Sequence, residues 1–278
     1  MKKGKILFTG GNGFLGRQLI PLLEEDGWDI VRPRSTQVRL EVDTEVDTLF
    51  ENDVFYDAII NAALVGGRRD ADDSRDIFYR NMMMFETLFR YVDRCGCFIN
   101  FDSGASLGRP AISERPQPSD LGKIVPGDPY GFSKYCIAQR VANHPRGRNL
   151  RVWGCFGEHE EPSRFFATNV KNYIKKEPIT LIKDRFMDFI YADDLYKIVS
   201  YFLKMKEKVH VKDVNCVYEE KHLLSEIAEM INNLDDYKVE ITREGQYPEH
   251  SYCGAPNDLG IDYIGLEQGI RECWSKWK

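Results

Sequence analysis

Short apolar runs alternate with helix-like stretches through the first half of the chain. The first helix-like stretch has one apolar face, formed by Leu15, Leu19, Leu22 and Leu23. Buried strands are predicted at four apolar runs, residues 5–8, 28–31, 57–63 and 98–101. Strands that alternate with helices are typical of a Rossmann-like, doubly wound parallel α/β sheet. Pro21 should kink or shorten the first helix, because it removes a backbone donor.

The pattern weakens after about residue 155, where amphipathic helices are expected at 165–176, 193–205 and 223–231. We therefore expect two units. The larger spans 1–154 and receives a returning segment at about 186–216. A smaller C-terminal lobe consists of 155–185 and 217–278.

Composition narrows the possible partners. The chain has 278 residues and a formal charge of −6, which disfavours a general nucleic-acid binder. No run approaches the roughly 18 apolar residues of a membrane span, so no membrane association is expected. The seven cysteines lack the spacing of metal ligands and indicate buried thiols in a reducing cytoplasm. No metal site is predicted.

Three glycines separate the first predicted strand from the first predicted helix. Gly10, Gly13 and Gly16 lie in the segment that also contains Asn12, Phe14 and Leu15. Glycine lets the backbone turn sharply and approach a pyrophosphate, and the helix N-terminus attracts the phosphates. This order of strand, turn and helix predicts a dinucleotide-binding site; the alternative is an incidental tight turn.

The residues after the second predicted strand indicate which dinucleotide is bound. An acidic residue is expected there for NAD, because it binds the ribose 2′-hydroxyl. Arg32 and Arg34 occupy this position instead and suit a 2′-phosphate. NADP(H) is therefore favoured over NAD(H), although both arginines could simply be solvated. Asp43 is expected to meet the adenine, with a surface turn as the alternative.

A tyrosine and a lysine one helical turn apart form the candidate catalytic pair. Asp128-Pro129 predicts a helix start, which puts Tyr130 and Lys134 on one helix face. A tyrosine with its ordinary pKa of about 10 shuttles protons poorly at pH 7, and a nearby ammonium favours the phenolate. Ser103 follows a predicted strand and could hold the substrate oxygen. The alternative is an ordinary surface pair of tyrosine and lysine.

Taken together, these motifs resemble the extended short-chain dehydrogenase/reductases that act on nucleotide sugars. The resemblance includes the glycine turn, Asn-Ala-Ala at 61–63, Asn81, Ser103 and Tyr130-Gly-Phe-Ser-Lys134. The branch most similar to this chain is that of the GDP-L-fucose synthases. The resemblance implies that Ala62, Ala63, Asn81, Tyr130 and Lys134 contact the cofactor. It also implies that the small lobe binds a nucleotide sugar, and that the chain forms a homodimer.

Several departures from that branch concern the substrate side. Its epimerising cysteine corresponds to Ala105, its histidine is missing, and Met187 and Gly154 replace an arginine and an asparagine. Cys155, His159 or Arg164 could replace the missing acid and base. Residues predicted to contact the substrate are Ser103, Ala105, Arg164 and Arg185.

The favoured function is NADPH-dependent reduction at C4 of a nucleotide-linked 4-keto-6-deoxy sugar, with GDP preferred and with or without C3/C5 epimerisation. One alternative is an NAD-dependent 4-epimerase. Another is a non-catalytic nucleotide-binding regulatory subunit. A 4,6-dehydratase is disfavoured, because Gly104-Ala105 replaces the acidic pair that such an enzyme carries after its serine or threonine.

Overall fold

A six-stranded sheet forms the centre of the computed structural model, which describes residues 3–67, 74, 76–108, 115–205, 211–245 and 251–278. Its strands, from one edge to the other, are β2 (Trp28–Val31), β1 (Gly4–Thr9), β3 (Tyr56–Asn61), β4 (Cys95–Ser103), β5 (Gly147–Val152) and β9 (Asp213–Cys216). All neighbouring pairs in this sheet are parallel. The order in which strands are added to the sheet reverses between β1 and β3, and ligands of such sheets bind at the carboxyl ends of the strands beside this point.

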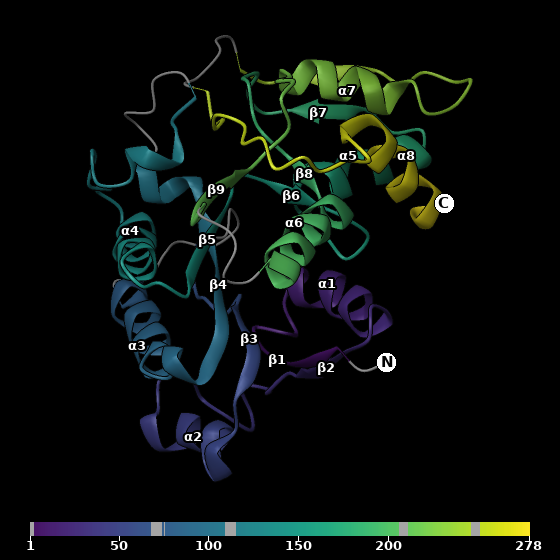
Figure 1. The fold of residues 1–278 in the computed structure, drawn as a ribbon. Coiled ribbons are helices and arrows are strands. Elements are labelled where there is room, and N and C mark those ends of the chain that lie inside the picture. The colour runs from purple at the N-terminus through teal and green to yellow at the C-terminus, as the bar shows by residue number, and fades with distance from the viewer. Residues whose placement is uncertain (1–2, 68–73, 75, 109–114, 206–210, 246–250) are drawn as a thin grey trace.

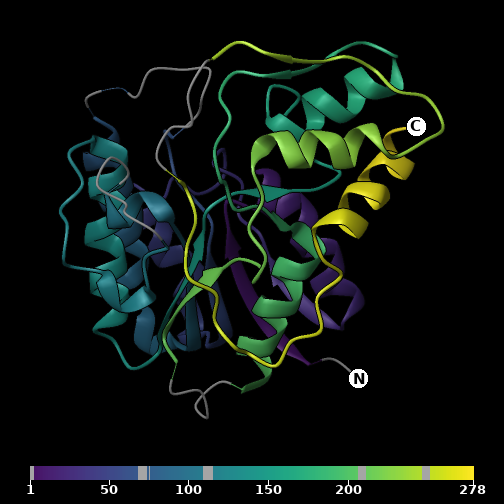
Figure 2. The ribbon, with the colours of Figure 1, turned by 90° about the horizontal axis from the view of Figure 1, so that it is seen from above.

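Helices cover both faces of the sheet (Figures 1 and 2). One face packs against α1 (Phe14–Glu25) and α6 (Ala192–Met205), and the other against α3 (Ile77–Phe89) and α4 (Pro129–Ala142). Ile6 and Phe8 point into the first layer, whereas Leu7 points into the second. Strands buried on both faces explain the continuous apolar runs of the sequence. The predicted doubly wound α/β fold is confirmed.

Short helices complete the large unit: α2 (Asp43–Asp47) and the 3₁₀ turns η1 (Thr48–Asp53), η2 (Val92–Arg94), η3 (Gly104–Leu107) and η5 (Pro118–Asp120). The expectation that Pro21 shortens the first helix is wrong, because α1 continues to Glu25. Pro21 is exposed, so water can reach the carbonyl of Arg17 that lacks its usual helical donor. The seven cysteines all lie within the described residues, and none of them forms a disulfide.

A smaller lobe lies above the carboxyl ends of the central strands in Figure 1. It contains two small sheets, β7 (Ile179–Leu181) with β10 (Ile241–Arg243) and β6 (Cys155–Phe156) with β8 (Ile190–Tyr191). Its helices are α5 (Phe165–Ile174), α7 (Leu224–Asn232) and α8 (Leu266–Trp277). A separate apolar core joins these elements and includes Met187, Phe189 and Tyr191 from the segment expected to return to the large unit. The division into two units stays a prediction. In the described part of the chain, no helix has both the length and the apolar character needed to cross a membrane.

A row of buried polar side chains crosses the central sheet near its carboxyl edge. Thr9, Asn61, Asn100, Asn149 and Asp213 stand opposite one another on five neighbouring strands. Each side chain hydrogen-bonds to the next, over distances from 2.6 to 3.2 Å. A one-residue slip of any strand would turn its polar group to the opposite face, so this row fixes the register.

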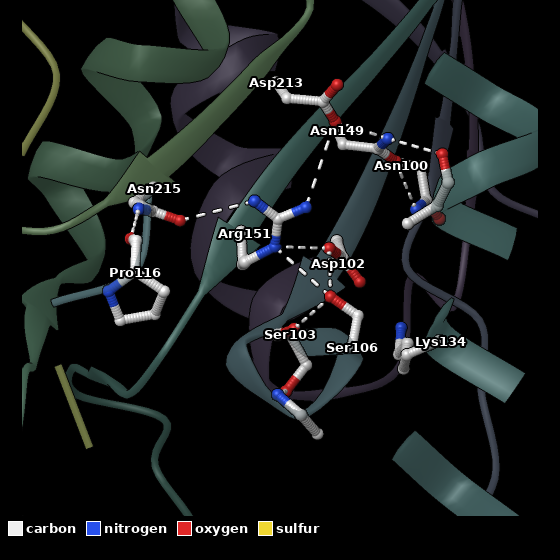
Figure 3. Close-up of polar contacts among 12 residues, drawn as sticks. Asn100, Asp102, Ser103, Ser106, Pro116, Lys134, Asn149, Arg151, Asp213 and Asn215 are labelled. Carbon is white, nitrogen blue, oxygen red and sulfur yellow. Dashed lines mark hydrogen bonds and ion pairs between the residues drawn. The ribbon is translucent and has the colours of Figure 1, made fainter. Parts of the chain in front are cut away.

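One step closer to the carboxyl edge, Arg151 on β5 forms an ion pair with Asp102 on β4 (Figure 3). Both side chains are fully buried, and Arg151 Nε donates to Asp102 Oδ2 at 2.7 Å. Ser106 also donates to Asp102, at 2.8 Å, and Asn215 Oδ1 accepts from Arg151 at 3.4 Å. The pair therefore fastens the end of β4 to β5, to η3 and to β9.

Removing one member of this pair should destabilise the protein strongly. Arg151→Met leaves the carboxylate of Asp102 buried without its cation, which typically costs about 3–5 kcal/mol of unfolding free energy. Urea denaturation measures the loss. The control is Arg271→Met, which removes an exposed pair with Glu267 on α8 and should cost less than about 1 kcal/mol. Equal effects of the two substitutions would contradict this role of the buried pair.

Candidate active site

The glycine turn after β1 is packed too tightly to accept side chains at two of its positions. Gly10 has a φ of +73°, and a Cβ there would lie 2.6 Å from the carbonyl carbon of Ala62. A Cβ on Gly16 would lie 2.4 Å from the carbonyl oxygen of Gly11. The turn therefore sits directly against the residues that follow β3.

This turn leaves the start of α1 open to an anion. Gly13 caps the helix without any side-chain hydrogen bond, so the first backbone N–H groups remain for a ligand. Asn12 is exposed at the turn, whereas Phe14 and Leu15 begin the helix and are partly buried. A close backbone cradle at a helix N-terminus fits the pyrophosphate of a dinucleotide.

Arg32 lies beside this cradle. A Cβ on Gly11 would be 3.1 Å from the Cβ of Arg32, which directly follows β2. The side chains of Arg32 and Arg34 are both exposed to solvent. Two exposed cations beside such a turn can bind a phosphate group.

The structure gives Asp43 a different environment from the one expected. Asp43 begins α2 and pairs with Arg90 at 3.2 Å, and the carbonyl of Asp43 also accepts from Arg90. Arg90 directly follows the carboxyl end of α3. Because α3 runs from the carboxyl edge of the sheet toward its amino edge, this end lies away from the glycine turn. The pairing speaks against an adenine contact for Asp43.

The side chain of Asn81 hydrogen-bonds to the protein backbone. The loop that follows Ala62 and Ala63 is held by Asn81, whose side chain accepts from the N–H of Val65 at 2.8 Å and donates to its carbonyl at 3.0 Å. Asn81 also donates to Ser133 Oγ on α4, at 3.2 Å. Asn81 therefore holds in place the loop after β3, which lies beside the glycine turn.

Tyr130 lies near the start of α4, under that same loop. The side chain of Asp128 caps this helix by accepting from the N–H of Gly131 at 2.8 Å. A Cβ on Gly67, whose φ is +70°, would lie 2.7 Å from the Tyr130 ring. The tyrosine is 9% exposed and packs with Ala105, which brings it close to the end of β4.

Lys134 lies one turn further along α4 and is also buried. Its ammonium donates to the carbonyl of Phe101 on β4, at 2.8 Å. Burial lowers the pKa of Lys134 to about 8, and the negative charge of Asp102 opposes this shift. The lysine is thus fixed at the end of β4, on the same helix as Tyr130.

Ser103 is the last residue of β4 and caps η3. Its Oγ accepts from the N–H of Ala105 at 3.2 Å and lies 3.4 Å from the hydroxyl of Tyr252. Figure 3 shows Ser103 beside Ser106, with Lys134 extending from α4 toward the same end of β4. The three predicted catalytic residues thus gather where β4 ends.

Tyr252, to which the sequence assigns no role, also reaches this site from the C-terminal segment. Its ring packs edge-on against Trp153 at 4.8 Å, and the guanidinium of Arg185 lies 5.9 Å from the ring centre. Arg185 follows β7 of the small lobe and is connected to Ser103 through Tyr252. In the sequence, Tyr252 lies two residues before Gly254-Ala255-Pro256, a string that resembles one near the C-terminus of the GDP-L-fucose synthases.

Ala105 is a correction to the predicted substrate contacts. Its side chain is fully buried between Tyr130 and Ile77, so a substrate cannot reach it in this structure. Arg164 lies at the start of α5 and pairs with Glu160 at 3.3 Å, which uses part of its charge. Of the two predicted arginines, only Arg185 is connected to Ser103 among the described residues. It contacts the ring of Tyr252, whose hydroxyl contacts Ser103.

Of the three residues considered as substitute epimerising groups, Cys155 is poorly suited to proton transfer. Cys155 is 4% exposed, and burial raises the pKa of its thiol well above the usual value. The backbone of His159 hydrogen-bonds to Gln18 and Arg17 in the first turns of α1, near the glycine turn.

Gly154 has no room for an asparagine side chain, because its Cβ would lie 2.6 Å from Phe189.

Comparison with known proteins gives relatives with matching architecture. A curated relative, the CDP-abequose synthase of Yersinia pseudotuberculosis, is 21% identical over 85% of this chain and 87% of its own. The dTDP-4-dehydrorhamnose reductase of Bacillus anthracis, solved with NADP, has a TM-score of 0.81 and 18% identity over 99% of both chains. A GDP-L-fucose synthetase from Naegleria fowleri, also bound to NADP, has a TM-score of 0.78 at 14% identity and covers 100% of this chain and 93% of its own.

The family profile described as the NAD dependent epimerase/dehydratase family matches residues 6–216. This match includes the glycine turn, the loop held by Asn81, and the Ser103, Tyr130 and Lys134 cluster. It confirms the family resemblance and the enzymatic character inferred from the sequence. The chain is a member of the NAD dependent epimerase/dehydratase family.

Proposed function

We propose that this protein reduces the C4 carbonyl of a nucleotide-linked 4-keto-6-deoxy sugar with NADPH. The observation that carries the proposal is the gathering of Ser103, Tyr130 and Lys134 at the end of β4, beside the loop after β3 that packs against the glycine turn. Such a set can hold a carbonyl oxygen and protonate it. By their names, the similar proteins described above act on GDP-, CDP- and dTDP-linked sugars, which supports this substrate class.

The roles of the residues follow from their chemistry. The serine hydroxyl of Ser103 donates a hydrogen bond to the carbonyl oxygen, and Tyr130 supplies the proton that converts it to a hydroxyl. Lys134 holds a positive charge one turn from Tyr130, which stabilises the phenolate left after proton transfer. The nicotinamide, when bound, supplies the hydride that the carbonyl carbon receives.

The substrate would lie between the small lobe and the end of β4. Arg185 is the cation best placed to bind its diphosphate, because it lies above Tyr252 and hence near Ser103. It also approaches the sulfur of Met187 at 3.8 Å, where the similar branch has an arginine. We favour a GDP-linked sugar. Reduction without C3/C5 epimerisation fits best, since Ala105 and the buried Cys155 cannot remove an α-proton.

A panel of 4-keto-6-deoxy sugars linked to GDP, CDP, dTDP and UDP tests the proposal. NADPH oxidation, followed by absorbance, is expected with at least one of them. Tyr130→Phe should lower kcat by about 100- to 10,000-fold, the usual contribution of a positioned acid, while NADPH still binds. No oxidation with any of the four would contradict the proposal. Full activity in Tyr130→Phe would mean that Tyr130 takes no part in the chemistry.

The preference for NADPH is assigned to Arg32 and Arg34. Both are exposed at the carboxyl end of β2, and Arg32 borders the glycine turn. Hydrogen bonds to charged groups contribute about 1.5–3 kcal/mol, so Arg32→Ala with Arg34→Ala should weaken NADPH binding by at least about tenfold.

Fluorescence titration with NADPH and NADH measures this preference. NADH affinity should change little in the double variant, because NADH lacks the 2′-phosphate. Arg90→Ala, which removes a cation paired with Asp43 at the end of α3, serves as the control. Equal losses for both coenzymes would argue against a phosphate contact.

The outer faces of α3 and α4 support a homodimer. Phe78 and Phe132 stack across the two helices at 4.9 Å, and Phe132 also stacks on Tyr135. Tyr79 beside them is 65% exposed. A partly buried aromatic cluster on two adjacent helices, with an exposed tyrosine on one of them, suits a self-complementary interface.

Sedimentation equilibrium measures the oligomeric state. We expect twice the mass of one 32.2 kDa chain for the wild type and a single-chain mass for Tyr79→Glu. Because Tyr79 is exposed, this substitution should leave the fold intact. A monomeric wild type at micromolar concentration would rule out this interface.

A further inference from the structure

Tyr252 reaches the end of β4 from a segment more than a hundred residues away in the sequence. Its hydroxyl oxygen lies 3.4 Å from Ser103 Oγ, and either atom could donate the proton of that contact. We propose that Tyr252 is a positioning residue, which donates to Ser103 and thereby directs the serine hydroxyl toward the substrate carbonyl. This inference rests on the proposed function, because the direction of that hydroxyl matters only if a carbonyl is bound there.

The hydrogen-bonding groups of Ser103 explain why the direction of this contact matters. A serine hydroxyl has one donor and two acceptor lone pairs. The N–H of Ala105 occupies one acceptor position, at 3.2 Å. If Tyr252 donates to the other, the O–H of Ser103 is the group left to bind the carbonyl oxygen. In the opposite arrangement, Ser103 would donate to Tyr252 and offer the carbonyl no proton.

The surroundings of Tyr252 hold it in place for this task. Its N–H donates to the carbonyl of Phe186 at 2.9 Å, and its own carbonyl accepts from Asp188 N–H at 3.0 Å. The ring packs on Trp153 at 4.8 Å, with Arg185 above it. A donor fixed before the substrate arrives does not need to be reoriented during the reaction.

Asp188 anchors the same segment further. It accepts from the N–H of Gly254 at 2.8 Å and forms a buried ion pair with Lys221 at 2.9 Å. A Cβ on Gly254 would lie 2.5 Å from the Trp153 indole nitrogen, so the backbone of this segment also packs closely against Trp153. These contacts fix the backbone on both sides of Tyr252 independently of its hydroxyl.

The substitution Tyr252→Phe removes the hydroxyl and keeps the ring. Loss of one hydrogen bond of about 0.5–1.5 kcal/mol should lower kcat about three- to tenfold with the 4-keto sugar that the panel identifies. The KM for NADPH and the melting temperature should stay at wild-type values. Tyr237→Phe is the matched control, because it removes a tyrosine hydroxyl that donates to Tyr173 within the small lobe; its kcat should not change.

A double-mutant cycle separates positioning from simple packing. If Tyr252 acts through Ser103, then Tyr252→Phe should cause no further loss of kcat in a Ser103→Ala enzyme. Additive losses would overturn the proposal. So would an unchanged kcat in Tyr252→Phe, or a loss as large as that of Tyr130→Phe, which would make Tyr252 itself the proton donor.

The outcomes also distinguish this inference from the proposed function. If the wild type oxidises NADPH with one of the sugars and the cycle is additive, the proposed reaction stands and the role of Tyr252 fails. If the wild type oxidises NADPH with none of them, both fail together.

Discussion

The buried ion pair between Asp102 and Arg151 is the interaction on which the geometry of this site depends. Asp102 lies between Phe101, whose carbonyl accepts from Lys134, and Ser103. Fixing Asp102 to the neighbouring strand therefore fixes the two points of β4 that the proposed chemistry uses. The polar row that ends at Asp213 adds a second constraint, since it sets the register of the strands below. Both lie in a dry interior, where a mispaired polar group is costly.

The substrate side of the site is assembled from segments distant in the chain. The connection to β8 carries Asp188, which holds the C-terminal segment through Gly254. That segment presents Tyr252 to Ser103, and Arg185 covers the tyrosine from the small lobe. The C-terminal segment and the end of β4 thus meet at one serine hydroxyl. A substrate bound between them would contact both units, which allows small changes in the lobe to alter specificity without altering the catalytic set.

The sequence predicted the parts of the fold that depend on local pattern. Alternating strands and helices, the glycine turn after β1 and the i, i+4 spacing of Tyr130 and Lys134 could all be recognised within a few residues. The errors and omissions depend on tertiary contacts. Asp43 pairs with a helix end that its sequence neighbourhood does not reveal, and Pro21 is tolerated because it faces water. Ala105 is buried by Tyr130, and Tyr252 becomes relevant only when the C-terminal segment folds back onto Trp153.

The central claim is that a carbonyl carbon of the sugar receives a hydride while residues of this chain protonate its oxygen. Reaction with NADPH deuterated at the transferring C4 position of the nicotinamide tests it directly, with the sugar product analysed by NMR and mass spectrometry. We expect one deuterium at the ring carbon that carried the carbonyl, and none at the neighbouring carbons when the reaction is run in D₂O with unlabelled NADPH. A product without deuterium at that carbon, or with solvent deuterium at C3 or C5, would contradict the account.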